Sequence, residues 1–203
     1  MKKHALFVVL IIGVALIIGI WRDNQGATHN AEQFSTSHFP QAQKVPQFEL
    51  MDMHGNRFTN AQLQQHWTFL FFGYTACPDI CPAMLNTIQK VSQQIGGQFN
   101  TQFVFISIDP THDTPQNLKE YLQQEKYHHT PIIGVTGASN KLHQLAQELG
   151  VHIEHGEEIE HGGTLLLINP EGKMTALFTH NKSDPLTIVQ DFKQILHHYA
   201  RNA

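Results

Sequence analysis

The chain has two cysteines, Cys77 and Cys81, which lie four positions apart in the stretch FFGYTACPDICPAML. Two thiols at this spacing suit a redox-active dithiol, a structural disulfide or half of a metal site, because residues i and i+4 share one face of a helix. Thioredoxin-type redox motifs place two residues between their cysteines, whereas here Pro78, Asp79 and Ile80 separate them. The spacing distinguishes this pair from the usual redox motif and leaves the three kinds of chemistry open.

The predicted surroundings of the two thiols favour the thiolate form. A buried strand is predicted to end just before them and a helix to begin just after them. The dipole and free N–H groups of a helix N-terminus lower the pKa of a nearby thiol. Thiolate is both the redox nucleophile and the metal-binding form, so this expectation does not separate the two functions. Two thiolates are soft donors, which match Cu(I) better than hard cations.

A soft metal held by two thiolates needs a further donor, and the chain has no third cysteine. We interpret most of the 15 histidines as solvated surface residues. His161 is the best candidate ligand, because it stands immediately before the last apolar strand in IEHGGTLLLINPEG. In an α/β sheet, the loop that enters this strand can lie beside the cysteine loop. His152 and His155 are alternatives in the same loop.

Two aspartates could lie beside such a metal without binding it. Asp79, between the cysteines, either caps the following helix, which is the simpler interpretation, or holds negative charge near the metal. Asp109 ends a predicted strand just before Pro110, and it either forms a turn or faces the same loop.

From residue 46 onward the sequence alternates strand-like and helix-like segments. Nearly continuous apolar runs at residues 67–74, 102–110 and 131–137 predict buried strands. Two hairpins are also predicted, one over residues 47–59 with HGN as its turn and one over residues 164–179 with NPEG as its turn.

Helical patterns follow the cysteine loop, the second and third buried strands and the last hairpin. We expect Asp113 or Thr114 to be the N-cap of the second helix, and Ser139 and Gly150 to start and stop the third. This order predicts an α/β domain with a central mixed β-sheet flanked by helices on both faces. The cysteines then fall at the carboxyl end of a strand, where open α/β sheets build their sites.

The N-terminal segment differs from the rest. Residues 5–21 form an uninterrupted apolar run of 17 residues, at the lower limit for a membrane-spanning helix. Lysines precede it, so the positive-inside rule leaves residues 1–4 in the cytoplasm. We expect residues 1–21 to be a cytoplasmic tip and transmembrane signal anchor, 22–44 a flexible linker and 45–203 the functional domain. This arrangement is single-pass at a bacterial inner membrane, with the domain in the periplasm; cleavage as a signal peptide is the alternative.

Composition excludes one class of partner. The formal net charge is −4 and the hydrophobic content is 41%, which suit a globular domain with a core. Nucleic-acid binding would require a basic surface, so we expect no nucleic-acid partner.

Three motifs resemble the Sco/SenC family of membrane-anchored copper proteins: FFGYTACPDICPAML, FVFISIDPTHDTPQNLKEYL and EHGGTLLLINPEGK. The resemblance runs from about residue 45 to the last helix. It implies a thioredoxin-like fold that binds copper, Cu(I) or Cu(II), through Cys77, Cys81 and His161. The family usually has Asp-His followed by Ser or Thr, whereas this chain has Glu160, His161 and Gly162. The ligand is kept, but the hydrogen-bonding residue beside it is lost.

The resemblance implies two functions. The first is a metallochaperone without turnover, which helps to assemble the binuclear copper centre of cytochrome c oxidase by passing copper to the receiving subunit. The second is a membrane-anchored thiol–disulfide oxidoreductase, which would need only Cys77 and Cys81 and could share the same dithiol. A peroxidase or redox sensor is the weakest alternative, because no Arg or Lys between residues 67 and 87 could activate a peroxidatic thiol.

Overall fold

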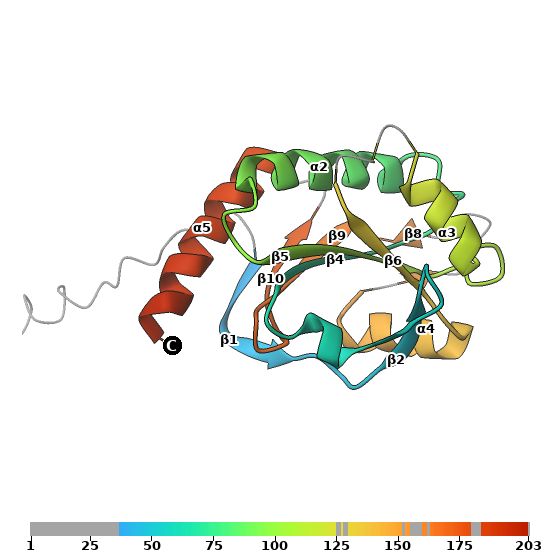
Figure 1. The fold of residues 1–203 in the computed structure, drawn as a ribbon. Coiled ribbons are helices and arrows are strands. Elements are labelled where there is room, and N and C mark those ends of the chain that lie inside the picture. The colour runs from blue at the N-terminus through green and yellow to red at the C-terminus, as the bar shows by residue number, and fades with distance from the viewer. Residues whose placement is uncertain are drawn as a thin grey trace, which may run out of the picture. The chain divides into compact units, whose positions relative to one another are not determined.

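The computed structural model describes residues 37–124, 127, 130–151, 153–154, 160–161, 163–179 and 184–202. Figure 1 shows a twisted sheet with helices on both faces. The strands are β1 (Ser37–Lys44), β2 (Glu49–Asp52), β3 (Arg57–Thr59), β4 (Trp67–Gly73), β5 (Thr101–Ser107), β6 (Ile132–Thr136), β7 (Ile153–Glu154), β8 (Glu160–His161), β9 (Thr164–Ile168) and β10 (Lys173–Thr179). The helices are η1, a 3-10 helix (Asn60–Leu63), α2 (Ile80–Ile95), α3 (Pro115–Leu122), α4 (Ser139–Glu148) and α5 (Pro185–Asn202).

The main sheet has eight strands in the order β1-β10-β9-β4-β5-β6-β2-β3. Strands β4, β5 and β6 are parallel neighbours, whereas β9 pairs antiparallel with β4 and β2 pairs antiparallel with β6. The two predicted hairpins are β2–β3 and β9–β10. The mixed sheet is therefore confirmed, and β7 and β8 add a separate two-stranded pair.

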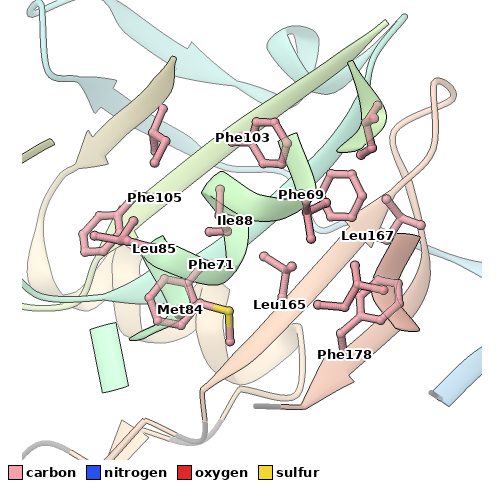
Figure 2. Close-up of a cluster of buried hydrophobic side chains, with 14 of the residues drawn as sticks. Phe69, Phe71, Met84, Leu85, Ile88, Phe103, Phe105, Leu165, Leu167 and Phe178 are labelled. Atoms are coloured by element: carbon pink, nitrogen blue, oxygen red, sulfur yellow. The ribbon is translucent and has the colours of Figure 1, made fainter. Parts of the chain in front are cut away.

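The core lies in two layers, one on each face of the sheet. Strand β4 is buried along its whole length. Phe69 and Phe71 point into one layer, beneath α2, while Leu70 and Phe72 point into the other. Figure 2 shows the first layer, where Phe71 lies among side chains of α2, β5 and β9. Burying one such phenylalanine contributes about 1.5–3 kcal/mol, so β4 is a stable support for the loop that follows it.

The C-terminal helix completes the first layer. Phe192 of α5 makes edge-to-face contacts with Trp67, at 5.6 Å between ring centroids, and with Phe69, at 5.2 Å. Helix α4 and η1 cover the second layer through Leu142, Leu145 and Leu63.

The helix ends agree only in part with the sequence. Thr114 is the N-cap of α3, and its hydroxyl accepts a hydrogen bond from the Asn117 N–H. Gly150, with φ of +74°, follows the end of α4 as expected. The expected cap at Ser139 is wrong: Ser139 is the first helical residue, and Ala138 occupies the cap position with no side-chain hydrogen bond.

Strand β1 occupies residues that were expected to belong to the linker. It pairs antiparallel with β10, and its register shifts between His38 and Gln43. An edge strand keeps one side open to water, so it needs neither a continuous apolar run nor strict alternation. Its polar composition therefore gave no strand signal, and Pro40 lies within the irregular part, where edge strands tolerate proline.

The predicted membrane anchor at residues 5–21 lies outside the described residues. Across the part of the chain that the structure describes, no helix combines the length and the apolar character needed to cross a bilayer.

Candidate metal centre

The cysteine loop leaves the carboxyl end of β4, next to the carboxyl end of β5. The two strands are parallel, with Gly73 opposite Ser107, and the Ile108 N–H donates to the Gly73 carbonyl oxygen at 2.9 Å. The loops that follow the two strands, one carrying the cysteines and one carrying Asp109, therefore start side by side.

The two cysteines are close together and neither forms a disulfide. Helix α2 begins at Ile80, so Cys81 is in its first turn while Cys77 is in the preceding loop. The Cys81 backbone N–H donates to the Cys77 Sγ at 3.3 Å. Cys77 is 7% exposed and Cys81 is 0% exposed, and both belong to the first core layer. The pair can therefore act as one dithiol, shielded from bulk water.

The expectation of a lowered thiol pKa is wrong for Cys81. Burial is the largest effect, and it raises the pKa of this thiol well above its ordinary value. A backbone hydrogen bond from Tyr74 acts in the opposite direction, while the neighbouring Cys77 and the charge of Asp113 raise the pKa further. The helix N-terminus does not compensate for the loss of water, so Cys81 holds its proton at neutral pH.

Gly73 sets the space available to Cys81. A Cβ added at Gly73 would lie 2.8 Å from the Cys81 Sγ, 2.8 Å from the Phe71 ring and 2.9 Å from the Phe105 ring. Real Cβ atoms essentially never approach other atoms this closely, so the absence of a side chain is what lets the sulfur pack against the strand. No motif or pattern around Gly73 indicates this role.

Asp113 is a residue of this site that the sequence interpretation missed. It is fully buried, and its carboxylate accepts hydrogen bonds from the Thr75 N–H at 3.1 Å and from the Thr75 hydroxyl at 2.5 Å. It also accepts one from the Ser107 hydroxyl at 2.6 Å. The carboxylate thus ties the cysteine loop to the end of β5. An aspartate just before a helix usually serves as a cap, so the position of Asp113 in the sequence predicts capping and not this role.

Asp109 forms the expected turn, because its carbonyl oxygen accepts hydrogen bonds from the His112 N–H at 3.2 Å and from the Asp113 N–H at 2.8 Å, whereas Asp79 does not act as a side-chain cap. Asp79 is exposed and occupies the N-cap position of α2, but its side chain makes no capping hydrogen bond. The Asp109 N–H donates to the Ser107 hydroxyl, and its carboxylate lies 2.7 Å from the Nδ1 of His112. Asp79 lies between the two cysteines, and Asp109 lies on the neighbouring loop that follows β5.

The backbone of His161 lies in β8, where it pairs with Ile153. Strand β9 begins three residues later, and its register places Leu165 opposite Phe71 of β4. The start of β9 and the end of β4 therefore lie next to each other, at the same end of these two antiparallel strands. The side chain of His161, and the whole of His152 and His155, lie outside what the structure describes. Among the side chains that it does describe, no group of three or more His, Cys, Asp or Glu forms a metal cluster.

Comparison with known proteins gives consistent results. The sequence matches the SCO1/SenC family over residues 36–197. A protein of Stutzerimonas stutzeri that is named for copper binding is 37% identical over 143 residues, which cover 66% of this chain and 69% of that protein.

Two solved structures resemble the fold. Copper-bound ScoI of Arabidopsis thaliana is 30% identical with a TM-score of 0.66, over 74% of this chain and 98% of its own. BsSco, described as a member of the Sco family of cytochrome c oxidase assembly proteins, has a TM-score of 0.67 over 77% of this chain and 95% of its own. At 20% identity the second likeness concerns the fold alone. Together they confirm the thioredoxin-like α/β fold.

Proposed function

The chain belongs to the SCO1/SenC family, and from that premise we propose that it is a copper chaperone that helps to assemble the binuclear copper centre of cytochrome c oxidase. The observation that carries this proposal is the reduced dithiol, with the Cys81 N–H 3.3 Å from the Cys77 Sγ at the carboxyl end of β4. Two thiolates held this close are a soft donor pair suited to Cu(I).

We propose His161 as the third ligand. Its backbone precedes β9, which runs antiparallel beside β4. A histidine at this position therefore lies at the same end of the central strands as the cysteine loop. Imidazole is a donor that suits copper and completes a three-coordinate set with two thiolates. Asp79 and Asp109 would lie beside the metal, where their negative charge favours a bound cation.

Copper binding to the two thiols releases protons. Each thiol that coordinates the ion gives its proton to the buffer, and Cys81, whose pKa is raised by burial, contributes one such proton at neutral pH. The copper ion is cargo: it arrives, displaces protons from the dithiol and leaves for a receiving subunit of the oxidase, without a change in the protein's covalent structure.

The location is also part of the proposal. The apolar run at residues 5–21, with lysines before it, supports a single-pass anchor in a bacterial inner membrane that holds the domain in the periplasm. A tether of this kind keeps the chaperone near a client that is itself embedded in the membrane.

A thiol–disulfide oxidoreductase is the second candidate, favoured by two cysteines that form no disulfide and lie close together, with the Cys81 N–H 3.3 Å from the Cys77 Sγ. In that reaction the dithiol would become a disulfide, and a client disulfide would take up the two electrons and two protons. This activity needs Cys77 and Cys81 but not His161.

One experiment separates the two functions. Cu(I) affinity is measured anaerobically, by competition with a chromogenic chelator, on the purified full chain in detergent. Reduction of insulin is measured on the same samples. The variants are Cys77→Ser, Cys81→Ser, His161→Ala and, as a matched control at the far end of β4, His66→Ala.

We expect His161→Ala to lose copper affinity by at least about tenfold, the lower end for disturbing a coordination environment, and to keep its dithiol reactivity. Unchanged copper affinity in this variant would remove His161 from the ligand set. Fast insulin reduction together with weak copper binding in the wild type would replace the chaperone by the oxidoreductase.

A further inference from the structure

The burial of the two thiols raises a question of access. Cys81 is 0% exposed and Cys77 is 7% exposed, so a copper complex in solution cannot meet both sulfurs in one encounter. Removing a cation from its water or carrier ligands without replacing them is costly. A donor that is exposed to solvent and adjacent to the dithiol would supply a replacement ligand before the ion enters.

His112 has the properties of such a donor. Its side chain is 74% exposed, and its Nδ1 lies 2.7 Å from the Asp109 Oδ2. When Nδ1–H donates to a carboxylate, the neutral imidazole keeps its lone pair on Nε2, and this carboxylate–histidine arrangement is the one that orients histidines at metal sites. The Nε2 of His112 makes no hydrogen bond within the described part of the chain and is free to bind a metal.

The loop that carries His112 is fixed against the cysteine loop. The next residue, Asp113, accepts hydrogen bonds from the N–H and hydroxyl of Thr75, which precedes Cys77 by two residues. The Asn117 side chain donates to the His112 carbonyl oxygen at 2.6 Å. Asp113 thus holds the loop of His112 against the loop that leads to Cys77. The imidazole and the two sulfurs form no three-ligand cluster in the described part of the chain, so transfer to the sulfurs is a separate step.

Stability does not explain the pair of Asp109 and His112. An ion pair with a partner this exposed contributes about 0–1 kcal/mol. The loop is already held by buried hydrogen bonds to Asp113 and by the bond from the Asp109 N–H to the Ser107 hydroxyl. The specific orientation of the ring is therefore better explained by a ligand that it meets.

We propose that His112, positioned by Asp109, is a capture ligand that takes Cu(I) from its carrier and passes it to Cys77 and Cys81. The inference rests on the proposed copper function and adds a step to it. In the first exchange a Cu–N bond to Nε2 forms and a bond to one carrier ligand breaks. In the second, two Cu–S bonds form, the Cu–N bond and the remaining bonds to the carrier break, the carrier is released, and the protons of the thiols pass to the buffer. The copper stays Cu(I) throughout.

The test separates rate from equilibrium. A coloured Cu(I)–chelator complex is mixed anaerobically with the purified full chain in a stopped-flow instrument, and the transfer rate is followed by the loss of the complex's absorbance. The variants are His112→Ala, Asp109→Asn and the control His66→Ala. The control also removes a histidine whose Nδ1 is engaged, 2.9 Å from the Gln64 carbonyl oxygen, but it precedes β4 and so lies at the opposite end from the cysteine loop.

We expect His112→Ala to slow transfer by about tenfold, the lower end for disturbing a ligand's surroundings, while the equilibrium affinity stays within about twofold of wild type. Asp109→Asn should also slow transfer, whereas His66→Ala should leave the transfer rate unchanged. Added imidazole should restore the transfer rate of His112→Ala.

An unchanged rate in His112→Ala would overturn the inference. So would an affinity that falls as much as the rate, because His112 would then be a permanent ligand. A wild type without measurable equilibrium affinity for Cu(I) would overturn the proposed function itself, an outcome that the affinity measurement reveals separately from the rate.

Discussion

Asp113 is predicted to hold the cysteine loop in place, and replacing it with alanine tests this directly. The substitution removes the acceptor for the Thr75 N–H, the Thr75 hydroxyl and the Ser107 hydroxyl. Asp113 and Ser107 are both 0% exposed, so water cannot replace the carboxylate at the Ser107 end without entering the core.

The size of the effect follows from these three donors. A buried donor that loses its partner costs about 1–3 kcal/mol. Thr75 is half-buried and can recover part of its bonding from water, so we take the lower end for each donor. Asp113→Ala should then lower the free energy of unfolding by about 3 kcal/mol. Asp113→Asn keeps the shape and one acceptor oxygen and should cost about 1 kcal/mol.

The assay is equilibrium unfolding in urea, followed by tryptophan fluorescence, with the slope against urea checked for constancy. Asp79→Ala is the matched control, because that aspartate is exposed on the same loop and makes no capping hydrogen bond; we expect a change within about 0.5 kcal/mol. If Asp113→Ala proved as stable as Asp79→Ala, the carboxylate would not be holding the loop and the reasoning would fail.

Two further results are expected. Gly73→Ala should cost about 1–3 kcal/mol through overpacking and also weaken Cu(I) binding, because the new Cβ meets the Cys81 Sγ at 2.8 Å. Gly137→Ala, which meets Leu50 at 2.6 Å instead, should destabilise without that change in affinity, and equal affinities in the two variants would contradict the role of Gly73. Because the folded pKa of Cys81 is raised, the unfolded chain loses its proton first. Stability of the copper-free protein should therefore fall as pH rises above about 8.5, by up to about 1.4 kcal/mol per pH unit from this thiol. Urea unfolding at pH 7.5 and 9.5 would show this fall in wild type and a smaller one in Cys81→Ser; identical pH dependence would refute the assignment.

Most of the fold could be predicted from the sequence because its central strands are buried on both faces. A strand such as β4 has no face in contact with water, so nearly all of its residues are apolar and the run at residues 67–74 is continuous. Strand β1 could not be found in the same way, since it lies at the edge of the sheet and is polar.

The position of the cysteine pair was predictable from the sequence, and its environment was less so. The spacing of Cys77 and Cys81 indicated a dithiol at the end of a strand, and the structure places it there. The direction of the Cys81 pKa depends on burial under residues far away in sequence, which a local argument from the helix dipole cannot include. The role of Asp113 likewise depends on Thr75, which lies 38 positions away.

A sulfur atom accepts a hydrogen bond from a backbone N–H in the first turn of helix α2. Since Asp79 makes no capping bond, the N–H of Cys81 has the Cys77 Sγ as its acceptor. The electron density on that sulfur differs among a thiol, a disulfide and a metal thiolate, and the resonance of a hydrogen-bonded amide responds to its acceptor. The backbone amide of Cys81 is therefore a built-in NMR reporter, able to distinguish the empty, oxidised and loaded protein without a probe attached to either cysteine.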